Sequence, residues 1–130
     1  MEIREMTISD FEEIKSILQT EFDEFWKPSI LESELKSDNS KYIVAKENFV
    51  VLGFAGILIT LDDTQITNIV TKKSERKKGI GSLLLDRLIE MTKEIGRNSI
   101  SLEVNEINEY AIHMYEKAGF EIVRKKKKVL

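Results

Sequence analysis

The first third of the chain carries apolar residues at the spacing of an amphipathic helix. The residues in this stripe are Phe11, Ile14, Leu18 and Phe22. Ser9 precedes the stripe and Glu12 follows Ser9 by three positions, which is the pattern of a capping box, so we predict a helix that begins near residue 10. The only proline, Pro28, should end or kink this helix and can start a second short helix through residues 29–37.

The hydrophobic period then changes from helical spacing to the alternation of strands. Residues 1–6 alternate in the same way and predict a short first strand. Residues 41–47, 50–60 and 65–71 are rich in β-branched and apolar side chains, and short polar turns near residue 48 and at 61–64 separate them. We therefore predict an antiparallel meander between residues 42 and 71.

After residue 72 helical and extended patterns alternate. An apolar stripe stops at Gly96 and predicts a helix that ends there; its members are Ile80, Leu83, Leu84, Leu88, Met91 and Ile95. Residues 99–104 predict a strand with Ile100, Leu102 and Val104 on one face. A helix over 108–118 should end at Gly119, and 120–130 is the last strand candidate. The predicted fold is α/β (α+β): one mixed, mostly antiparallel sheet flanked by helices, in a single domain over residues 1–130.

The composition argues against disulfides, a metal site and a membrane span. The 130 residues are 42% hydrophobic and 33% charged, which is an ordinary globular mixture. The chain has no cysteine and only one histidine, His113, so we expect neither a disulfide framework nor a metal site. We see no leader pattern, and the apolar runs are too short for a membrane span, so we expect no membrane association and a cytoplasmic location.

The net charge of −3 is distributed unevenly. Residues 1–38 hold 11 acidic and 4 basic residues, whereas the remainder of the chain is basic overall. This division can give an acidic entrance for a cationic substrate, to which Glu21, Asp23 and Glu24 would contribute, and a basic cradle for an anionic one; solvated helix faces are an equally ordinary explanation.

The segment "RKKGIG", residues 76–81, lies between a predicted strand and a predicted helix. Backbone N–H groups at a helix N-terminus favour a phosphate, and Lys77 and Lys78 add positive charge. Gly79 and Gly81 allow the backbone to approach a bulky anion. Residue 84 is Leu84 where a dinucleotide fingerprint has its third glycine, and no G-K-[ST] sequence is present, so neither common phosphate motif applies. A basic turn without a ligand remains an alternative.

A second set of polar residues lies on the helix predicted at 108–118. Asn108 and Tyr115 are seven positions apart, so they share one face of this helix. Asn108 is also an N-cap candidate. Spacing alone equally allows Tyr115 to be a core aromatic residue with its hydroxyl at the surface.

Taken together, "NIVTKKSERKKGIGSLLL", "SLEV" and "NEYAIHMYEKAGF" resemble the GNAT superfamily of acetyl-CoA-dependent N-acetyltransferases. Within it, the ribosomal-protein alanine N-acetyltransferase type is the most similar. The resemblance covers residues 42–124, and residues 1–40 are compatible with the start of this fold. The specific feature is the combination of R-x-x-G-x-G with a downstream N-x-x-A-x-x-x-Y-x-x-x-G-F.

The resemblance implies an acyl-CoA N-acyltransferase fold and a site for acetyl-CoA. Strand residues 69–71 would run beside the pantetheine arm, residues 77–82 would hold the pyrophosphate, and Asn108 would bind the arm from the other side. The residues implied in cofactor binding are Ile69, Val70, Thr71, Arg76, Lys77, Lys78, Gly79, Ile80, Gly81, Ser82 and Asn108.

The resemblance also assigns the reaction. An amine nucleophile must lose a proton before it attacks the thioester, and Glu103 is the implied general base. A backbone N–H near Val70 or Thr71 would stabilise the oxyanion, and Tyr115 is the implied general acid for the thiolate. Glu103 is alternatively a solvated surface residue. Asp62 and Asp63 are rival carboxylates, although "LDDT" is typical turn chemistry.

The expected acceptor is a primary amine, either a protein N-terminus or a small cationic amine. The alternative function is a non-catalytic domain that binds coenzyme A or a partner protein. The chain departs from the family at Lys77, where glycine is usual, at Lys73, where proline is common, at Thr71, where valine is common, and at Asn105, where the alanine-acetylating type tends to have arginine.

Compared with the family, the sequence is one C-terminal strand short. A homodimer partner, a shifted last strand, or an open edge protected by Lys125–Lys128 would each compensate. Four lysines without interleaved aromatic residues are a weak nucleic-acid signal, so we expect no nucleic-acid partner.

Overall fold

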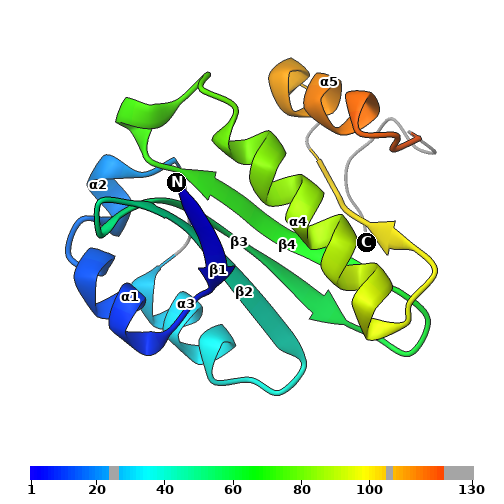
Figure 1. Ribbon diagram of the computed structural model, residues 1–130, viewed down its shortest axis with the longest axis horizontal. Coiled ribbons are helices and arrows are strands. Elements are labelled where there is room, and N and C mark those ends of the chain that lie inside the picture. The colour runs from blue at the N-terminus through cyan, green and yellow to red at the C-terminus, as the bar shows by residue number, and fades with distance from the viewer. Residues whose placement is uncertain (24–26, 105–106, 122–130) are drawn as a thin grey trace.

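The computed structural model describes residues 1–23, 27–104 and 107–121. Within them the sheet has five strands in the order β1-β2-β3-β4-β5; the first four are antiparallel, and β5 is parallel to β4 (Figure 1). The strands are β1 (Glu2–Glu5), β2 (Ser40–Glu47), β3 (Val50–Ile59), β4 (Thr64–Thr71) and β5 (Ile100–Ser101). The helices are α1 (Ile8–Ile14), α2 (Leu18–Glu21), α3 (Pro28–Leu35), α4 (Ile80–Ile95) and α5 (Glu109–Lys117), with a 3₁₀ turn, η1, at Lys73–Glu75. The predicted mixed, mostly antiparallel sheet is confirmed.

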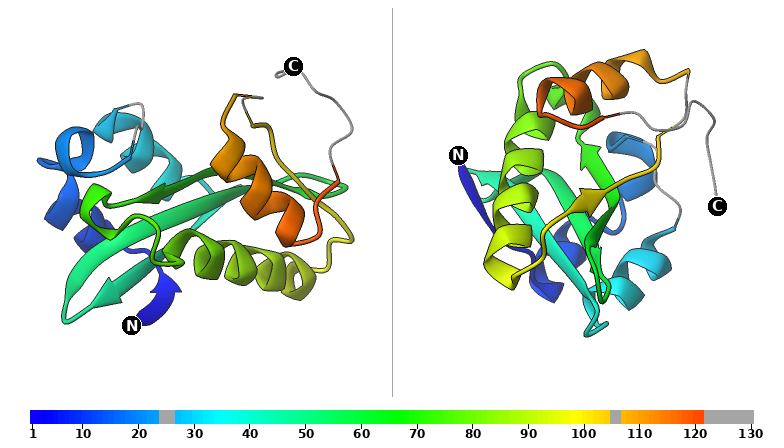
Figure 2. Two further views of the ribbon diagram at one scale, coloured as in Figure 1. Left: turned by 90° about the horizontal axis from the view of Figure 1, so that it is seen from above. Right: turned by 90° about the vertical axis from the view of Figure 1, so that its right-hand side faces the viewer.

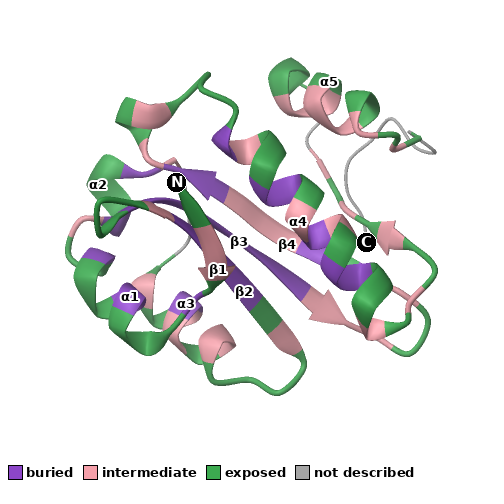
Figure 3. Ribbon diagram, in the orientation of Figure 1, coloured by how far each residue is buried: buried purple, intermediate pink, exposed green. Residues whose placement is uncertain are grey.

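The helices pack on opposite faces of the sheet and enclose two apolar clusters. Helices α1, α2 and α3 cover one face and α4 covers the other, as Figure 2 shows. The buried residues run along the centre of the sheet and the inner side of α4 (Figure 3). All four apolar residues predicted for the first helical stripe are buried, and they lie in the cluster under α1–α3.

The single helix predicted for the first stripe is wrong in extent: it is divided into α1, which ends at Ile14, and α2, which begins at Leu18, and α1 begins earlier than predicted. Its N-cap is Thr7, not Ser9, and Asp10 in the third helical position completes the capping box. Thr7 has extended backbone angles and its hydroxyl accepts from the Asp10 N–H at 3.2 Å, while the Asp10 carboxylate accepts from the Thr7 N–H at 2.8 Å. Ser9 lies inside the first turn. The error arose because two overlapping polar pairs fit the same motif, and Asp10 is the acidic member that is buried.

The α4 stripe is confirmed except at one position. The helix ends at Gly96, which has a positive φ of 92°. Leu83 was predicted to be buried, but its side chain is 44% exposed, and Leu85 is buried instead. Leu84, Leu85 and Leu88 form the centre of the buried face, and Leu83 is rotated away from it by one helical step.

β5 is shorter than the strand predicted at 99–104. Only Ile100 and Ser101 pair with β4, through Thr64 and Gln65. The predicted alternation nevertheless continues, because Ile100 and Leu102 pack against the apolar cluster under α4 while Glu103 is exposed. Of the strand predicted at 120–130, Phe120 and Glu121 are not in a strand, and residues 122–130 lie outside the described part of the chain. Of the helices in the described ranges, none is both long and apolar enough for a membrane span.

Candidate active site

The sheet has a gap beside the second half of β4, where β5 no longer pairs with it. β5 pairs with β4 only at Thr64 and Gln65, so residues 66–71 have no strand on that side among the described residues. On its other side β4 pairs with β3 at every position except Thr67. A gap between two parallel strands leaves backbone hydrogen-bonding groups available to a ligand that lies in the gap as an added strand would.

The register of β3 and β4 identifies these backbone groups. The Lys72 N–H donates to the Leu52 carbonyl at 2.8 Å, so the alternating pattern of an antiparallel ladder directs Val70 and Asn68 toward β3 as well. Ile69 and Thr71 therefore direct their N–H and C=O groups toward the gap. Of the two oxyanion donors suggested by the sequence, the register disfavours Val70, because its N–H faces β3, and favours Thr71.

The two residues that follow the end of α2, Phe22 and Asp23, close the far end of this edge. The Asp23 N–H donates to the Thr71 carbonyl at 2.9 Å, and Phe22 forms an isolated antiparallel bridge with Lys72. Within the described ranges, both backbone groups of Ile69 and the N–H of Thr71 remain open on this edge. Phe22 itself is fully buried, so this closure is anchored in the core.

The glycine loop leads directly into α4. Gly79 is the N-cap with a φ of 84°, and no side chain caps this helix end within the described residues. The first bond of the helix runs from the Leu83 N–H to the Gly79 carbonyl at 3.1 Å, which leaves the N–H groups of Ile80, Gly81 and Ser82 without a partner inside the helix. Lys77 also has a positive φ, 62°, which is costly for a residue other than glycine. These donors, together with the helix dipole, can bind a phosphate.

Three parts of the site lie in close contact at Gly81. A Cβ atom at Gly81 would lie 3.3 Å from Met114 Sδ on α5 and 3.9 Å from Ile69 Cγ2 on β4. The structure thus brings together the glycine loop, the gap side of β4 and α5, although Ile69 and Met114 are more than 40 positions apart in the sequence. Only glycine allows this close approach without displacing Met114.

The charges around the loop are partly paired. Arg76 forms a short ion pair with Asp23, and Lys78 lies 3.3 Å from Glu75. Lys77 is exposed and takes part in no ion pair within the described residues. Glu21 lies 3.7 Å from Lys72. The acidic surface predicted around Glu21 and Asp23 is therefore neutralised by the basic residues near the loop, and Glu24 lies outside the described residues.

The second motif forms helix α5 as predicted. Asn108 is its N-cap, and its side-chain oxygen accepts from the Ala111 N–H at 3.1 Å, so its amide N–H groups remain available. Tyr115 packs edge-on against Phe120, with ring centroids 5.7 Å apart. Burial raises the pKa of Tyr115 to about 12, so its hydroxyl stays protonated at neutral pH.

The position of Glu103, the implied general base, does not distinguish a catalytic role from that of a solvated surface residue. Glu103 is exposed and follows the end of β5. Asp63 accepts from the Thr60 hydroxyl at 2.7 Å and from Ser101 at 3.0 Å, which confirms that the "LDDT" segment is a turn. His113 is exposed.

Sequence reasoning missed one polar cluster, which lies beside a β-bulge in β4. The register shifts between Gly56 and Ile57, so Thr67 is an extra residue without an opposite partner. Next to it, the Asn68 amide donates to the Tyr42 hydroxyl at 2.7 Å, and Tyr42 forms a short hydrogen bond to Glu34. These residues come from β2, α3 and β4, and no spacing in the sequence relates them.

The described residues contain no group of three or more acidic, histidine or cysteine side chains that could hold a metal ion. The site therefore consists of backbone donors, a basic loop and a few polar side chains. Such a set suits a phosphate-bearing ligand that also has an extended, amide-containing arm.

Comparisons with known proteins agree with this geometry. Residues 11–120 match the model of the acetyltransferase (GNAT) family. The [ribosomal protein bS18]-alanine N-acetyltransferase of Haemophilus influenzae is 33% identical over 120 residues, which cover 91% of this chain and 80% of that protein. The ribosomal-protein-S18-alanine N-acetyltransferase of Escherichia coli superimposes with a TM-score of 0.82 at 25% identity, over 92% of this chain and 77% of that chain.

A further solved structure has the same fold and a relevant ligand. The aminoglycoside N-acetyltransferase AAC(6')-Iy, in complex with CoA, superimposes with a TM-score of 0.78 over 99% of this chain and 96% of that one. At 17% identity this likeness concerns the fold alone.

Proposed function

Because this chain belongs to the acetyltransferase (GNAT) family and is an N-acetyltransferase, we propose that it transfers the acetyl group of acetyl-CoA to the N-terminal amine of a protein. The first candidate acceptor is the N-terminal alanine of ribosomal protein bS18, because two similar proteins are named for that activity. A small cationic amine is the alternative acceptor.

The observation that carries this proposal is the open edge of β4 beside the N-terminus of α4. The Ile69 backbone groups on that edge suit an amide of the pantetheine arm, and the N–H groups of Ile80, Gly81 and Ser82 suit the pyrophosphate. Lys77 adds a positive charge at the loop. Asn108, with its oxygen used in capping, offers N–H donors from the α5 side.

Direct transfer requires one bond to form and one to break. The acceptor nitrogen forms a bond to the acetyl carbon, the C–S bond of the thioester breaks, and the proton lost from nitrogen goes to a base. We assign the base to Glu103, acting directly or through water, and the oxyanion donor to the Thr71 N–H. Tyr115 protonates the departing thiolate; its raised pKa keeps this proton in place until the thiolate forms.

The test is thiol release from acetyl-CoA, followed with a thiol reagent, against peptides with different N-terminal residues and against small amines. The chain contains no cysteine, so the protein itself gives no background signal. We expect release with a peptide that begins with alanine, and mass spectrometry should locate the acetyl group on its α-amine.

Two variants test the assigned roles. Glu103→Gln and Tyr115→Phe should each lower kcat by about 10²-fold or more while coenzyme A binding persists. Asp62→Asn is a matched control, because Asp62 lies in an exposed turn and should leave kcat unchanged. Full turnover by both variants would refute the residue assignments, and binding of coenzyme A without release on any amine would favour a non-catalytic binding domain.

A further inference from the structure

The cluster of Tyr42, Glu34 and Asn68 has a fixed direction of hydrogen bonding. The Glu34 carboxylate can only accept, so the Tyr42 hydroxyl donates its proton to Glu34. The Tyr42 oxygen then accepts from the Asn68 amide at 2.7 Å. Burial raises the pKa of Tyr42 above its usual range, with the hydrogen bond to Glu34 acting in the same sense, so the hydroxyl keeps its proton.

This direction determines how the Asn68 side chain is turned. Its NH₂ group must face Tyr42 and Thr67, the latter at 3.4 Å, because a reversed amide would place its oxygen against the Tyr42 oxygen, whose only hydrogen is already directed to Glu34. Asn68 Oδ1 consequently lies on the other side of the amide from Tyr42 and Thr67. It is buried and accepts no hydrogen bond from any described residue. A buried acceptor without a donor is destabilising unless another molecule supplies one.

Asn68 is also placed beside the reaction site. It precedes Ile69, whose backbone groups face the gap between β4 and β5, and it follows the bulge at Thr67. Its side chain lies on the same face as Val70, which is the face covered by α1 and α3. The glycine loop and α5 meet the opposite side chain, that of Ile69. Figure 2 shows α1–α3 and α4 on the two sides of the sheet.

A direct transfer brings two reactants together through this gap. If the acetyl donor lies against α4 and α5, the acceptor must approach from the face that carries Asn68. On that face the cluster offers an unfilled acceptor, Asn68 Oδ1, and the negative charge of Glu34. Both features favour a donor with positive charge, such as an ammonium group.

We propose that Asn68 Oδ1 accepts a hydrogen bond from the amino group of the acetyl acceptor, with Tyr42 fixing the orientation of Asn68 and Glu34 providing the attracting charge. Asn68 contacts the substrate, and Tyr42 and Glu34 act through it as positioning residues. The inference rests on the proposed function, because it takes the open edge of β4 as the place of transfer.

The test measures binding of a peptide with a free N-terminal alanine to the protein saturated with coenzyme A, by calorimetry. The same peptide with an acetylated N-terminus is the reference ligand. The wild-type protein should prefer the free amine, and Asn68→Ala should weaken binding of the free peptide about 10-fold to 100-fold and abolish the preference. Asn68→Ser is a second variant in case the alanine substitution impairs folding.

The positioning residues have a matched control on the same helix. Glu34→Gln keeps the acceptor for Tyr42 but removes the charge, and should weaken binding of the free peptide about threefold to fivefold. Glu32→Gln removes a carboxylate that is 40% exposed and paired with Lys36, and should have no effect. Tyr42→Phe frees the Asn68 amide to reverse and should reduce the preference for the free amine. In each variant the affinity for coenzyme A should stay within twofold of wild type.

The outcomes distinguish failure of the proposed Asn68 contact from failure of the proposed transferase activity. Loss of the free-amine preference in Asn68→Ala, with coenzyme A affinity unchanged, supports the site. Wild-type affinity and preference in both Asn68 variants would overturn it, as would failure of the wild-type protein to distinguish the two peptides. Binding of the free peptide without thiol release would contradict the transferase proposal and leave the Asn68 site supported.

Discussion

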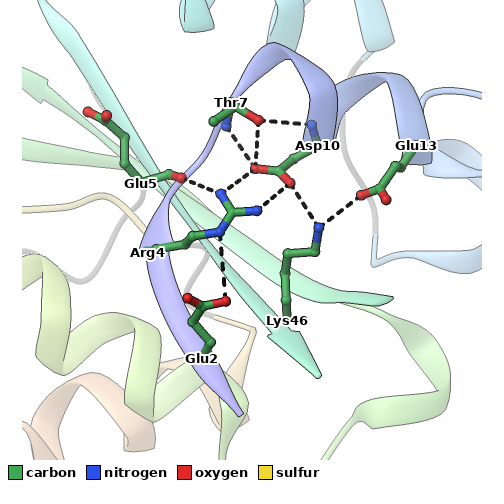
Figure 4. Close-up of polar contacts among 7 residues, drawn as sticks. All are labelled: Glu2, Arg4, Glu5, Thr7, Asp10, Glu13 and Lys46. Carbon is green, nitrogen blue, oxygen red and sulfur yellow. Dashed lines mark hydrogen bonds and ion pairs between the residues drawn. The ribbon is translucent and has the colours of Figure 1, made fainter. Parts of the chain in front are cut away.

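Replacing Asp10 by asparagine should lower the free energy of unfolding by about 3 kcal/mol at pH 7. The hydrogen bonds of Asp10 connect α1 to β1 and β2, as Figure 4 shows. Its carboxylate is 2% exposed and accepts from both terminal nitrogens of Arg4, at 2.8 and 2.9 Å, and from Lys46 at 3.1 Å. It also caps α1 through the Thr7 N–H at 2.8 Å.

The magnitude follows from these contacts. Hydrogen bonds to charged groups contribute about 1.5–3 kcal/mol each, and a helix cap contributes about 1 kcal/mol. With these values, the loss of every hydrogen bond of Asp10 and of the helix cap would cost more than about 5 kcal/mol. Arg4, however, is 35% exposed and keeps its bond to the Glu5 carbonyl, and Lys46 keeps Glu13. The side-chain oxygen of asparagine can also accept some of these hydrogen bonds. We therefore expect a loss of about half of that sum.

The assay is chemical denaturation, supported by thermal unfolding. A loss of about 3 kcal/mol should lower Tm by roughly 10 °C in a chain of this length. Glu13→Gln is the control, because Glu13 is 46% exposed and contacts the same lysine at 3.2 Å; it should cost about 0.5 kcal/mol or less.

The difference between wild type and Asp10→Asn should also depend on pH. Burial opposes ionisation of Asp10, but the hydrogen bonds from Arg4, Thr7 and Lys46 outweigh it and hold the pKa of this carboxyl well below its usual range. A lowered folded-state pKa gives stability that is complete above the unfolded pKa of about 3.9 and is lost as pH falls toward the folded value. The difference should therefore be constant from pH 8 to about 5 and shrink below pH 4. A loss equal to that of Glu13→Gln, or one that does not change in acid, would refute this account.

Three further predictions concern the site and its support. Gly79→Ala and Gly96→Ala both place a side chain at a positive φ in open space, so each should cost about 1 kcal/mol of stability, but only Gly79→Ala should weaken coenzyme A binding in calorimetry; equal affinities would argue against the glycine loop as the phosphate site. Gly56→Ala would put a Cβ atom 2.4 Å from the Tyr42 ring, which is held at its hydroxyl, so denaturation should show a loss of about 2–3 kcal/mol, and a loss below 0.5 kcal/mol would contradict the ring position. Since the pKa of Tyr115 is raised to about 12, kcat should not fall through deprotonation of this residue between pH 8 and 10; a decline there that Tyr115→Phe removes would show that the hydroxyl ionises at a lower pH.

The sequence alone predicted the elements whose signal is local. Apolar period, glycine and proline positions predicted β2, β3, β4, α4 and α5, because one buried face imposes its own spacing on a helix or strand. The glycine loop and the N-cap at Asn108 were predicted for the same reason: a backbone turn or a helix start needs particular residues at adjacent positions. The Ser9 cap failed because two candidate boxes overlapped and only burial of Asp10 distinguished them.

Other features of the site depend on contacts between distant segments. The parting of β4 from β5 after Gln65, the closing of the β4 edge by Asp23, and the meeting of Gly81 with Met114 are properties of packing, and no local pattern encodes them. The same is true of the bulge at Thr67, beside which Asn68 bonds to Tyr42 and its oxygen has no donor among the described residues. Sequence specifies which side chains can bond; only the tertiary structure decides which bonds are completed within the chain and which are left for a ligand.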